Sequence, residues 1–476
     1  MARLSLEAIA GAVRGQVTLG ARPPEQGAQH RVEGYSIDSR SVGPGDLFFA
    51  IVGPRLDGHD FVNEAVTRGA VAAVVARGGP GTYPQAPALV RVADTTRALQ
   101  ELGAHVRRMR PLKVVGITGS AGKTTAKEMT GMVLSRRFLT ERSEGNLNNT
   151  YGLPLTLARL HDDRQVAVLE MGMSTRGEIA RLAEIADPDV GVILNVLRVH
   201  LEHFGSLAKI AAAKGELFQG MRRDAVAIYN ADDRHAARLG AAFPGRRLAF
   251  GLETRKADLN AAAITAEGLD ATRFTLRRGR EQRDVRLRIA GRHNVYNALA
   301  AAAVGTALDL DLETIAAGLE TFAPAAMRGV LHRLAGGPEL LDDSYNSNPA
   351  AMEKAIALLS EATPRGRRVL VAGDMLELGP YGTRAHTLLG EQVAASGLDL
   401  FVAVGPLCRR AADAARAHGA KEVRHFDDSQ TAAPFVAEIC RAGDLLLVKG
   451  SRGMRMERVV QAVLARFGVT GKGGGH

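Results

Sequence analysis

The stretch Val114-Val115-Gly116-Ile117-Thr118-Gly119-Ser120-Ala121-Gly122-Lys123-Thr124-Thr125 decides the fold of this 476-residue chain. An apolar run typical of a buried strand enters a glycine-rich turn, and Lys-Thr-Thr then opens a predicted helix that continues to Leu134. Glycines let main-chain N–H groups approach an anion, and a helix N-terminus adds partial positive charge. The stretch therefore predicts a phosphate-binding loop in an α/β fold.

This loop differs from a strict P-loop at Ile117, where the consensus has glycine, and instead has a Thr-Gly-x-x-Gly-Lys-Thr pattern. A chance Gly-Lys-Thr in a surface loop is the alternative, which the flanking strand and helix patterns disfavour. Lys123 is placed to reach terminal phosphates and Thr124 to hold Mg²⁺. The pattern indicates ATP or GTP but leaves the reaction open. The predicted nucleotide-binding residues are Thr118, Gly119, Ser120, Ala121, Gly122, Lys123, Thr124 and Thr125.

The composition indicates a globular protein of two to four domains, with 46% hydrophobic and 24% charged residues. The net charge of +10 is dispersed as arginine and only 4% of residues are aromatic, which favours phosphate-bearing ligands over nucleic acid. The two cysteines, Cys408 and Cys440, lack metal-site spacing, so we expect a reduced, cytoplasmic protein. No segment has the 18 continuous apolar residues of a membrane span, and the N-terminus does not resemble a signal peptide.

Alternating strand and helix patterns predict three α/β units, at residues 1–110, 111–323 and 324–476. The first is a small unit rich in turns. The second is expected to be a mostly parallel nucleotide-binding sheet around the phosphate loop. The third is expected to be a doubly wound, Rossmann-like sheet. Because the third unit has no phosphate loop of its own, it should serve the central nucleotide or bind another substrate.

Three further residues of the central unit are candidates for catalysis. Glu170 ends a predicted parallel strand, and a carboxylate at that position faces the ligand crevice, where a metal-holding acid belongs. His200 follows the next strand, and Lys214 lies on the helix predicted from Leu207 to Gln219. Taken alone, His200 is more simply interpreted as an ordinary surface histidine, and Lys214 as a solvated helix lysine.

With these residues in view, the chain resembles the Mur ligase family over nearly its whole length. No single motif is decisive, but their joint order is specific, and the family shares the Thr-Gly-x-x-Gly-Lys-Thr form. The motifs are, in order, SIDSRSVGPGDLFFAI, DGHDF, TGSAGKTT, GNLNNTYGLPLT, EMGMSTRGEIA, HLEHFGS, AAAKGELF, GRHNVYNALAA, MRG, DDSYNSNP, GDMLELG and VKGSRGMRME.

The resemblance implies an ATP-dependent ligase of cytoplasmic peptidoglycan precursor synthesis. Family members transfer the γ-phosphoryl group of ATP to a substrate carboxylate, and an amine then attacks the acyl phosphate, so that an amide forms and phosphate leaves. The DDSYNSNP and GDMLELG motifs resemble those of members that join D-alanyl-D-alanine to UDP-N-acetylmuramoyl-tripeptide. We further expect a monomer that binds no nucleic acid.

Carried over residue by residue, the resemblance also implies the site. Lys123 and the loop amides would hold the β- and γ-phosphates, and Thr124 and Glu170 one Mg²⁺. His200 would hold a second Mg²⁺ together with a carbamoylated Lys214, so Lys123, Glu170, His200 and Lys214 are the implied catalytic residues. Further implied ATP contacts are Asn294, Arg328, Asp343, Tyr345 and Asn346. The implied contacts to the UDP-substrate are Ser39, Arg40, Asp46, Phe48, Asp57, Gly58, His59, Asn146, Asn148 and Asn149.

Two alternatives stay open at this point. A relative that adds the third amino acid to the UDP-muramoyl-dipeptide typically carries Asp-Asn-Pro-Arg in the C-terminal unit, and this chain has none. A non-ligating P-loop switch would have no need of the second metal site that Glu170, His200 and Lys214 suggest. The sequence does not reveal whether the substrate tripeptide ends in lysine or in diaminopimelate.

Overall fold

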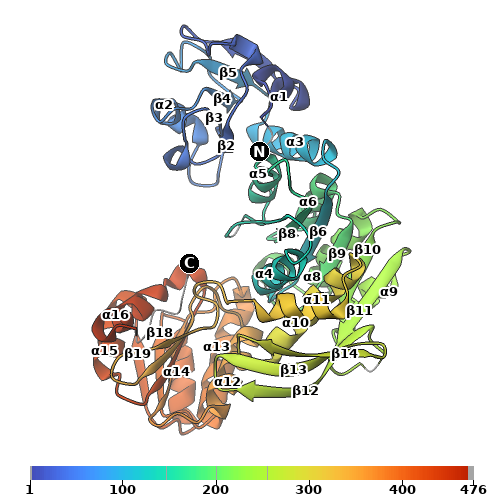
Figure 1. Ribbon diagram of the computed structural model, residues 1–476. Helices are drawn as coiled ribbons and strands as arrows, with labels where there is room; N and C mark the ends of the chain where they lie inside the picture. Colours follow the sequence, from blue (N-terminus) through green and yellow to red (C-terminus); the bar gives the residue numbers. More distant parts are fainter. Residues whose placement is uncertain (1–2, 146, 200, 255, 470–476) are drawn as a thin grey trace.

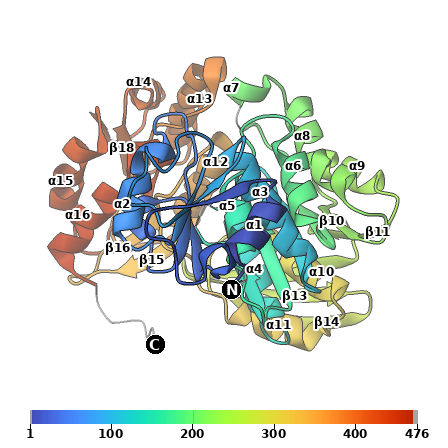
Figure 2. The same cartoon turned by 90° about the horizontal axis from the view of Figure 1, so that it is seen from above.

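The computed structural model describes residues 3–145, 147–199, 201–254 and 256–469, and it contains three sheets that follow one another along the chain (Figure 1). The predicted three-part α/β architecture is confirmed. Figure 2 shows from above that the first sheet lies over the region between the other two parts. Within the described residues no helix is both long and apolar enough to cross a membrane.

The first sheet has five strands in the order β1-β5-β4-β3-β2, and only the β1–β5 pair is antiparallel. Its core packs against α1 and α3 on one face and α2 on the other. The elements are α1 (Leu6–Ala12), β1 (Gln16–Leu19), η1 (Gly27–Gln29), β2 (Gly34–Ser36), η2 (Ser39–Ser41), β3 (Asp46–Phe49), η3 (Gly58–Phe61), α2 (Val62–Thr67), β4 (Ala72–Val75), β5 (Ala88–Arg91) and α3 (Thr95–Arg108).

The second sheet has nine strands in the order β14-β13-β12-β11-β10-β9-β6-β8-β7. From β7 to β12 neighbouring strands run parallel, and buried side chains fill both faces of this part. Its elements from β6 to β9 are β6 (Lys113–Thr118), α4 (Lys123–Leu134), β7 (Thr140–Arg142), α5 (Gly152–Ala158), β8 (Val166–Glu170), α6 (Glu178–Ala186) and β9 (Val190–Ile193).

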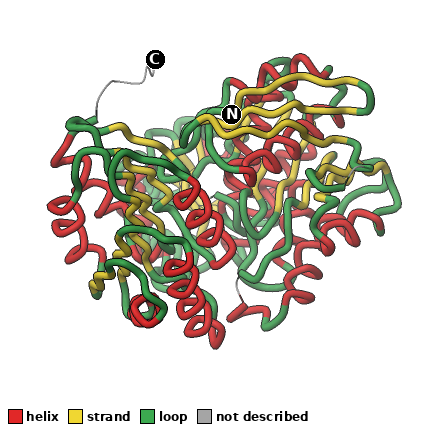
Figure 3. The backbone as a smooth tube through the Cα atoms, turned by 90° about the horizontal axis from the view of Figure 1, so that it is seen from below, coloured by secondary structure: helices red, strands yellow, loops and turns green. Residues whose placement is uncertain are grey.

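Beyond β9 the same sheet continues into an antiparallel extension, β12–β13–β14, which the mostly parallel prediction did not anticipate (Figure 3). The alanine-rich helix α10 is buried on most sides and packs against β10, β11, β12 and β13. The elements are α7 (Leu201–Phe204), α8 (Leu207–Gly220), β10 (Val226–Asn230), α9 (Arg234–Ala241), β11 (Arg246–Gly251), β12 (Leu259–Glu267), β13 (Ala271–Arg278), β14 (Glu281–Leu287), α10 (Arg292–Ala307) and α11 (Leu312–Glu320).

The third sheet has six strands in the order β15-β16-β20-β17-β18-β19, with β15 alone antiparallel to its neighbour. Helices cover both faces, which is the doubly wound arrangement that the sequence predicts. The elements are β15 (Val330–Arg333), β16 (Glu339–Asp343), α12 (Pro349–Glu361), β17 (Arg368–Gly373), η4 (Gly379–Tyr381), α13 (Gly382–Ala395), β18 (Leu400–Val404), α14 (Cys408–Ala417), β19 (Val423–Phe426), α15 (Ser429–Ile439), β20 (Leu445–Lys449), η5 (Arg452–Met454) and α16 (Glu457–Phe467).

Helix α5 joins the first sheet to the second. It packs along α3, and its Leu155 and Ala158 enter the core of the first sheet. The guanidinium of Arg159, just after α5, donates to the carbonyl of Tyr35 on β2 at 2.8 Å. Contact between the second and third parts includes α7 against η4, where Gly379 approaches Glu202 closely. The three parts are therefore connected through packed elements as well as through the chain.

Candidate active site

Strand β6 lies between β8 and β9 in parallel register, so the carboxyl ends of all three strands meet at one edge of the sheet. Ile117 lies opposite Glu170 on β8 and Val192 on β9. The phosphate loop leaves β6 at this edge and enters α4 at Gly122, which has a left-handed φ of +85°. A Cβ at Gly122 would lie 2.4 Å from Oδ1 of Asn297, so only glycine fits there.

The loop amides fall into two groups. The N–H groups of Ser120 and Ala121 donate to Oδ1 of Asn195 at 3.0 and 2.9 Å, so a neighbouring side chain already holds the loop in shape. Within the described chain, the N–H groups of Lys123, Thr124 and Thr125 make no hydrogen bond. These first-turn amides of α4 are the donors that remain available to an anion.

Thr124 and Glu170 meet as the sequence predicts. Thr124 Oγ1 donates to Glu170 Oε2 at 2.8 Å, and Nδ2 of Asn148 donates to Oε1 of the same carboxylate at 2.8 Å. Glu170 is 4% exposed. A hydroxyl and a carboxylate oxygen at this separation form a donor set that suits Mg²⁺, a cation that prefers oxygen ligands.

Two lysines of this region, Lys123 and Lys214, make no salt bridge to a described carboxylate. Nζ of Lys123 donates to the Gly119 carbonyl at 3.1 Å, and burial lowers its pKa, with Arg328 adding to the effect and Glu170 opposing it. Lys214 on α8 is only 2% exposed and makes no hydrogen bond or salt bridge to a described residue. Burial, and then the charge of Lys123, hold the pKa of Lys214 well below its ordinary value.

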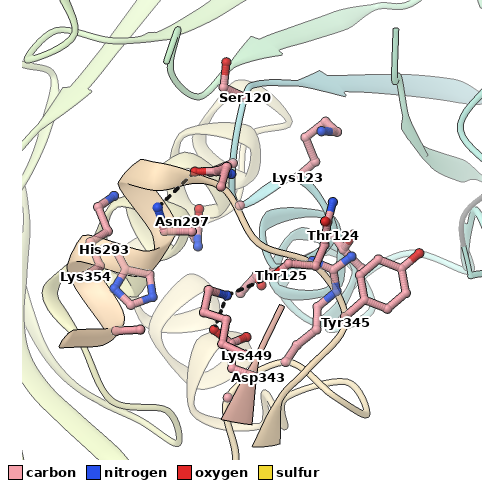
Figure 4. A pocket seen from close by; sticks show the side chains of 18 of the residues that line it. Ser120, Lys123, Thr124, Thr125, His293, Asn297, Asp343, Tyr345, Lys354 and Lys449 are labelled. Carbon is pink, nitrogen blue, oxygen red and sulfur yellow. Dashed lines mark hydrogen bonds and ion pairs between the residues drawn. The ribbon is translucent and has the colours of Figure 1, made fainter. Parts of the chain in front are cut away.

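A cavity of about 480 Å³ lies between the phosphate loop and the third sheet (Figure 4). Its walls come from α4 and α10 of the second part and from β16 and α12 of the third. Ser120, Ala121, Gly122, Lys123, Thr124, Thr125, Asn148, Asn149, Glu170, Asn294, Arg328, Asp343, Tyr345 and Asn346 are the predicted site residues that line it. The structure thus gathers predicted nucleotide residues from two sheets into one space.

In the third part, contacts among the predicted residues and with Lys449 fix their positions. The guanidinium of Arg328 lies over the ring of Tyr345, 4.0 Å from its centroid. Nζ of Lys449 pairs with Asp343 Oδ2 at 2.5 Å and donates to the Asn346 carbonyl at 3.0 Å. These contacts hold Arg328, Tyr345, Asp343 and Lys449 in place along the cavity that the phosphate loop also lines; Tyr345, Asp343 and Lys449 are labelled in Figure 4.

Several predicted residues do not face the cavity. Thr118 Oγ1 is buried and donates to the Met171 carbonyl at 2.9 Å, while Gly119 packs on Leu194. Lys214 does not line the cavity, although its charge interacts with that of Lys123. Asn149 reaches the cavity wall, but its Oδ1 accepts from the N–H groups of Tyr151 and Gly152 at the start of α5. His200 and Asn146 lie outside the described residues.

The residues predicted for the UDP-substrate lie on the first sheet and are engaged in its turns. His59 is 4% exposed, with Nδ1 2.6 Å from Asp57 Oδ1 and Nε2 accepting from the Ala76 N–H at 2.9 Å. Gly58 passes so close to the main chain of Ala50 and Ile51 that a Cβ would clash. These contacts fix the turn that precedes α2, and a role of its residues in substrate binding stays a prediction.

The remaining residues predicted for the UDP-substrate differ in burial and in the contacts that they make. Phe48 is a core residue at 1% exposure, Asp46 accepts from the Gly43 N–H at 2.9 Å, and Ser39 Oγ donates to Glu64 at 3.0 Å. Arg40 is exposed and makes a two-pronged contact with Asp38, at 2.9 and 2.7 Å. Of this set, the Arg40 guanidinium is the group best placed to meet a ligand phosphate.

Sequence reasoning missed several residues of the site. His293, Asn297, Lys354 and Lys449 line the cavity, and burial lowers the pKa of His293 to about 4, with the charge of Lys354 adding to the effect. His293 and Asn297 stand in the GRHNVYNALAA motif and Lys449 in VKGSRGMRME, so the signal was present in stretches that had been singled out.

Lys127 was also missed, although it lies one turn beyond the phosphate loop. It is 1% exposed; its Nζ donates to the Ser143 carbonyl and lies 3.0 Å from Glu128 Oε1. Ser143 Oγ in turn accepts from the Glu170 N–H at 3.1 Å. Lys127 therefore ties α4 to the segment that supports the Glu170 carboxylate.

Comparisons with known proteins agree with this geometry. Three families match consecutive parts of the chain: "Mur ligase family, catalytic domain" at residues 31–110, "Mur ligase middle domain" at 117–305, and "Mur ligase, glutamate ligase domain" at 327–452. The UDP-N-acetylmuramoyl-tripeptide--D-alanyl-D-alanine ligase of Escherichia coli K12 is 39% identical over 443 residues, 92% of this chain and 95% of that protein. The chain belongs to the Mur ligase family.

Other Mur ligases extend the match. The Bacillus subtilis 168 enzyme of the same name is 35% identical and covers 98% of this chain and 99% of its own. Among solved structures, MurF from Acinetobacter baumannii has a TM-score of 0.86 and 35% identity, covering 97% of this chain and 99% of that one. Thermotoga maritima MurF, solved in complex with ADP, has a TM-score of 0.79 and 29% identity, with coverages of 91% and 97%.

The cavity walls come from two sheets, so a productive Mur ligase site should assemble when the third part closes on the second. We expect the hinge near residues 322–330, a segment in which Met327 and Gly329 have φ of +62° and +73°. Small-angle scattering should show a smaller radius of gyration when an ATP analogue and the UDP-substrate are both added. Profiles that stay identical with and without these ligands would contradict the closure.

The separation of Arg40 from the phosphate loop predicts independent effects on binding. Arg40→Ala should weaken binding of the UDP-substrate by about tenfold, the scale of one lost charge-assisted hydrogen bond, and leave ATP affinity within about twofold. Lys123→Ala should weaken ATP binding and turnover instead. Calorimetry with each ligand alone would measure both effects, and an equal loss of ATP affinity in the two variants would refute the modular arrangement.

Proposed function

We propose that this chain is an ATP-dependent ligase that joins D-alanyl-D-alanine to UDP-N-acetylmuramoyl-tripeptide, with release of ADP and phosphate. The main support is that relatives with this name are 35–39% identical to the chain over more than nine-tenths of its length. The geometry agrees, since a cavity between two sheets presents phosphate-binding amides, metal-binding oxygens and several cations to one ligand. Amide formation from a carboxylate and an amine needs such an activating site.

In this proposal, the α4 N-terminus and Lys123 bind the β- and γ-phosphates of ATP. Thr124 and Glu170 would hold a Mg²⁺, which would supply charge neutralisation at the phosphates. Asn148 keeps the Glu170 carboxylate oriented through the 2.8 Å hydrogen bond. Asn294, Arg328, Asp343, Tyr345 and Asn346 contact the rest of the nucleotide across the cavity.

Lys214 fits a carbamate better than a free ammonium. A buried ammonium with no acceptor is costly, and Lys123 adds like-charge repulsion. Carbamoylation by CO₂ converts the amine into an anionic oxygen ligand, which removes that repulsion and supplies the ligand type that Mg²⁺ prefers. His200, which lies outside the described residues, is proposed as the partner ligand of this second Mg²⁺.

The proposed reaction brings two anions, the substrate carboxylate and the triphosphate of ATP, together in a site lined by cations. The carboxylate of the UDP-substrate attacks the γ-phosphorus, and ADP leaves. The dipeptide amine attacks the carbonyl carbon of the acyl phosphate, loses a proton, and the C–O bond to phosphate breaks. Lys123 and Arg328 line the cavity in which these charges develop, so they are placed to stabilise both transition states.

The wider setting is proposed from the family. The first part would bind the UDP-sugar end of the substrate, with Ser39, Arg40, Asp46, Phe48 and the Asp57–His59 turn shaping that site, and Asn146, Asn148 and Asn149 near the sugar or peptide. The protein would act in the cytoplasm as a monomer, in peptidoglycan precursor synthesis. Dispersed positive charge would serve these anionic substrates rather than a nucleic acid.

The competing ligase activity, addition of the third amino acid, has weaker support. A UDP-N-acetylmuramoyl-L-alanyl-D-glutamate--2,6-diaminopimelate ligase structure matches with a TM-score of 0.53 and 20% identity, which indicates a shared fold alone. The absent Asp-Asn-Pro-Arg stretch also argues against it.

A substrate panel tests the proposed function. We expect ATP-dependent phosphate release with UDP-muramoyl-tripeptide plus D-alanyl-D-alanine, and at least about 100-fold less with UDP-muramoyl-dipeptide plus diaminopimelate or lysine, because a site built for one polar substrate discriminates strongly. Omitting either the UDP-substrate or the dipeptide is the control for idle ATP hydrolysis. Efficient turnover of the dipeptide precursor would overturn the assignment.

Lys214→Arg tests the carbamate. Arginine keeps the positive charge but cannot form a carbamate or supply oxygen ligands, so ligation should fall by about 100-fold or more while the fold and UDP-substrate binding persist. Lys214→Ala should behave alike, with partial rescue by a small carboxylate at high concentration. Mass spectrometry under gentle conditions should find an added 44 Da, about the mass of CO₂, on the wild type only. Wild-type turnover by Lys214→Arg would identify Lys214 as a structural lysine.

A further inference from the structure

Among the described residues, two hydrogen-bonded links lead from helix α4 to Glu170. The first is the bond from Thr124 Oγ1 to Glu170 Oε2. The second starts from Lys127, one turn further along α4. Its Nζ donates to the Ser143 carbonyl, and the Ser143 hydroxyl accepts from the Glu170 N–H at 3.1 Å. One link therefore ends on the carboxylate of this glutamate and the other on its main chain.

Stability alone does not account for a lysine at position 127. Its side chain is 1% exposed and does not line the nucleotide cavity, so it does not reach a ligand there. Apart from the Ser143 carbonyl, its ammonium has the Glu128 carboxylate, at 3.0 Å, and Glu128 also pairs with Arg142. Burial of an ammonium is costly, and replacing a buried ion pair by apolar side chains is often neutral or stabilising.

Ser143 is well placed to transmit the position of Lys127 to Glu170. It directly follows β7, whose last residue, Arg142, pairs with Val168 on β8. The Ser143 N–H donates to the Val168 carbonyl at 3.1 Å, and Ser143 is 2% exposed. This residue is therefore fixed to β8 on one side and to α4 on the other.

A bound cation would change the first link but not the second. Thr124 Oγ1 and Glu170 Oε2 lie 2.8 Å apart. Two adjacent oxygens of an octahedral Mg²⁺ site, with bonds of about 2.0–2.1 Å, lie about 2.9 Å apart, so the spacing already suits this cation. A hydroxyl whose oxygen faces a cation directs its proton away from it, and the bond to Glu170 is then lost. The link through Lys127 and Ser143 continues to hold α4 at the same distance from Glu170.

We propose that Lys127 is a positioning residue. Through Ser143 it fixes the spacing between Thr124 and Glu170, and it thereby makes the site select Mg²⁺ over a larger divalent cation such as Ca²⁺. The inference rests on the Mg²⁺ site of the proposed function. Ca²⁺ takes oxygen ligands at about 2.3–2.6 Å in a more flexible geometry, so a rigid spacing disfavours Ca²⁺ and a loosened one admits it.

The test measures the affinity of a non-hydrolysable ATP analogue by calorimetry in excess Mg²⁺, in excess Ca²⁺ and in EDTA. The wild type should bind the analogue about tenfold more tightly with Mg²⁺ than with Ca²⁺. Lys127→Met keeps a long side chain but removes the donor. This variant should lose about tenfold in affinity with Mg²⁺, the scale for outer partners of metal ligands, and less than about threefold with Ca²⁺ or in EDTA.

Ser143→Ala removes the hydroxyl that accepts from the Glu170 N–H, so it should reduce the preference for Mg²⁺ in the same way. Because both residues act through one link, the double variant should lose no more than about twofold beyond the larger single loss. The matched control is Lys113→Met, which removes an exposed lysine of β6 outside the nucleotide cavity and should keep the wild-type preference. Affinity for the UDP-substrate within about twofold shows that each variant folds.

An equal loss of affinity with Mg²⁺, with Ca²⁺ and in EDTA would show that Lys127 only holds α4 in place. An unchanged preference for Mg²⁺ in Lys127→Met would also refute the proposal, and if this variant does not fold, Ser143→Ala alone decides. A wild type that binds the analogue no better with Mg²⁺ than in EDTA would overturn the metal site and the role of Lys127 together. Failure of the wild type to ligate D-alanyl-D-alanine would contradict the proposed reaction alone.

Discussion

The hydrogen bond from Thr124 Oγ1 to Glu170 Oε2 is the contact on which the site depends. It joins the first turn of α4 to the end of β8, across 46 residues of sequence, in a buried environment. The parallel register of β6 with β8 makes this meeting possible, because it places the carboxyl ends of both strands at the same edge. Apart from Lys113, every residue of the two strands is buried, so hydrophobic burial fixes their register, and the register places Thr124 and Glu170 together.

The electrostatics of the cavity follow from that frame. Lys123 and Lys214 are held in a buried region with few acceptors, and Arg328, Lys354 and Lys449 approach from the other side. Only Lys449 has a full carboxylate partner, in Asp343. Such an arrangement lowers the free energy of unfolding unless an anion is bound. Binding of a triphosphate should therefore raise the free energy of unfolding again.

Much of the fold could be predicted from the sequence because buried strands consist almost entirely of apolar residues. The runs at 114–117, 166–169 and 445–448 are continuously apolar, which is typical of buried parallel strands, and all three are strands. The antiparallel extension β12–β14 was missed because β13 and β14 are rich in arginine and all three strands are partly exposed. Its alternation is visible in β13, where Phe274 and Leu276 point inward, but it is weaker than a buried run.

The site was predictable only where a motif implies a geometry. The phosphate loop led to Lys123, Thr124 and Glu170, since strand and helix directions determine where those side chains meet. His59 could not be judged in the same way, because its two ring nitrogens are occupied by Asp57 and Ala76, and only the fold reveals that. The burial of Lys127 could not be predicted from the sequence. A lysine in a helix is expected to be solvated, and its burial becomes apparent only once the packing of its neighbours is known.

Helix α12 separates the nucleotide cavity from a second cavity of about 290 Å³, whose lining includes Met352, Glu353 and Met375. Asn348 caps the helix through the N–H of Ala351, and Pro349 fixes its first turn, so the helix begins rigidly at the end of the DDSYNSNP stretch. The nucleotide side carries Lys354, and the opposite side carries Glu353. Any movement of the third part that brings Asp343 and Tyr345 toward a nucleotide must therefore move the wall of the second cavity as well. A rigid helix shared by both walls therefore makes the shapes of the two cavities depend on each other.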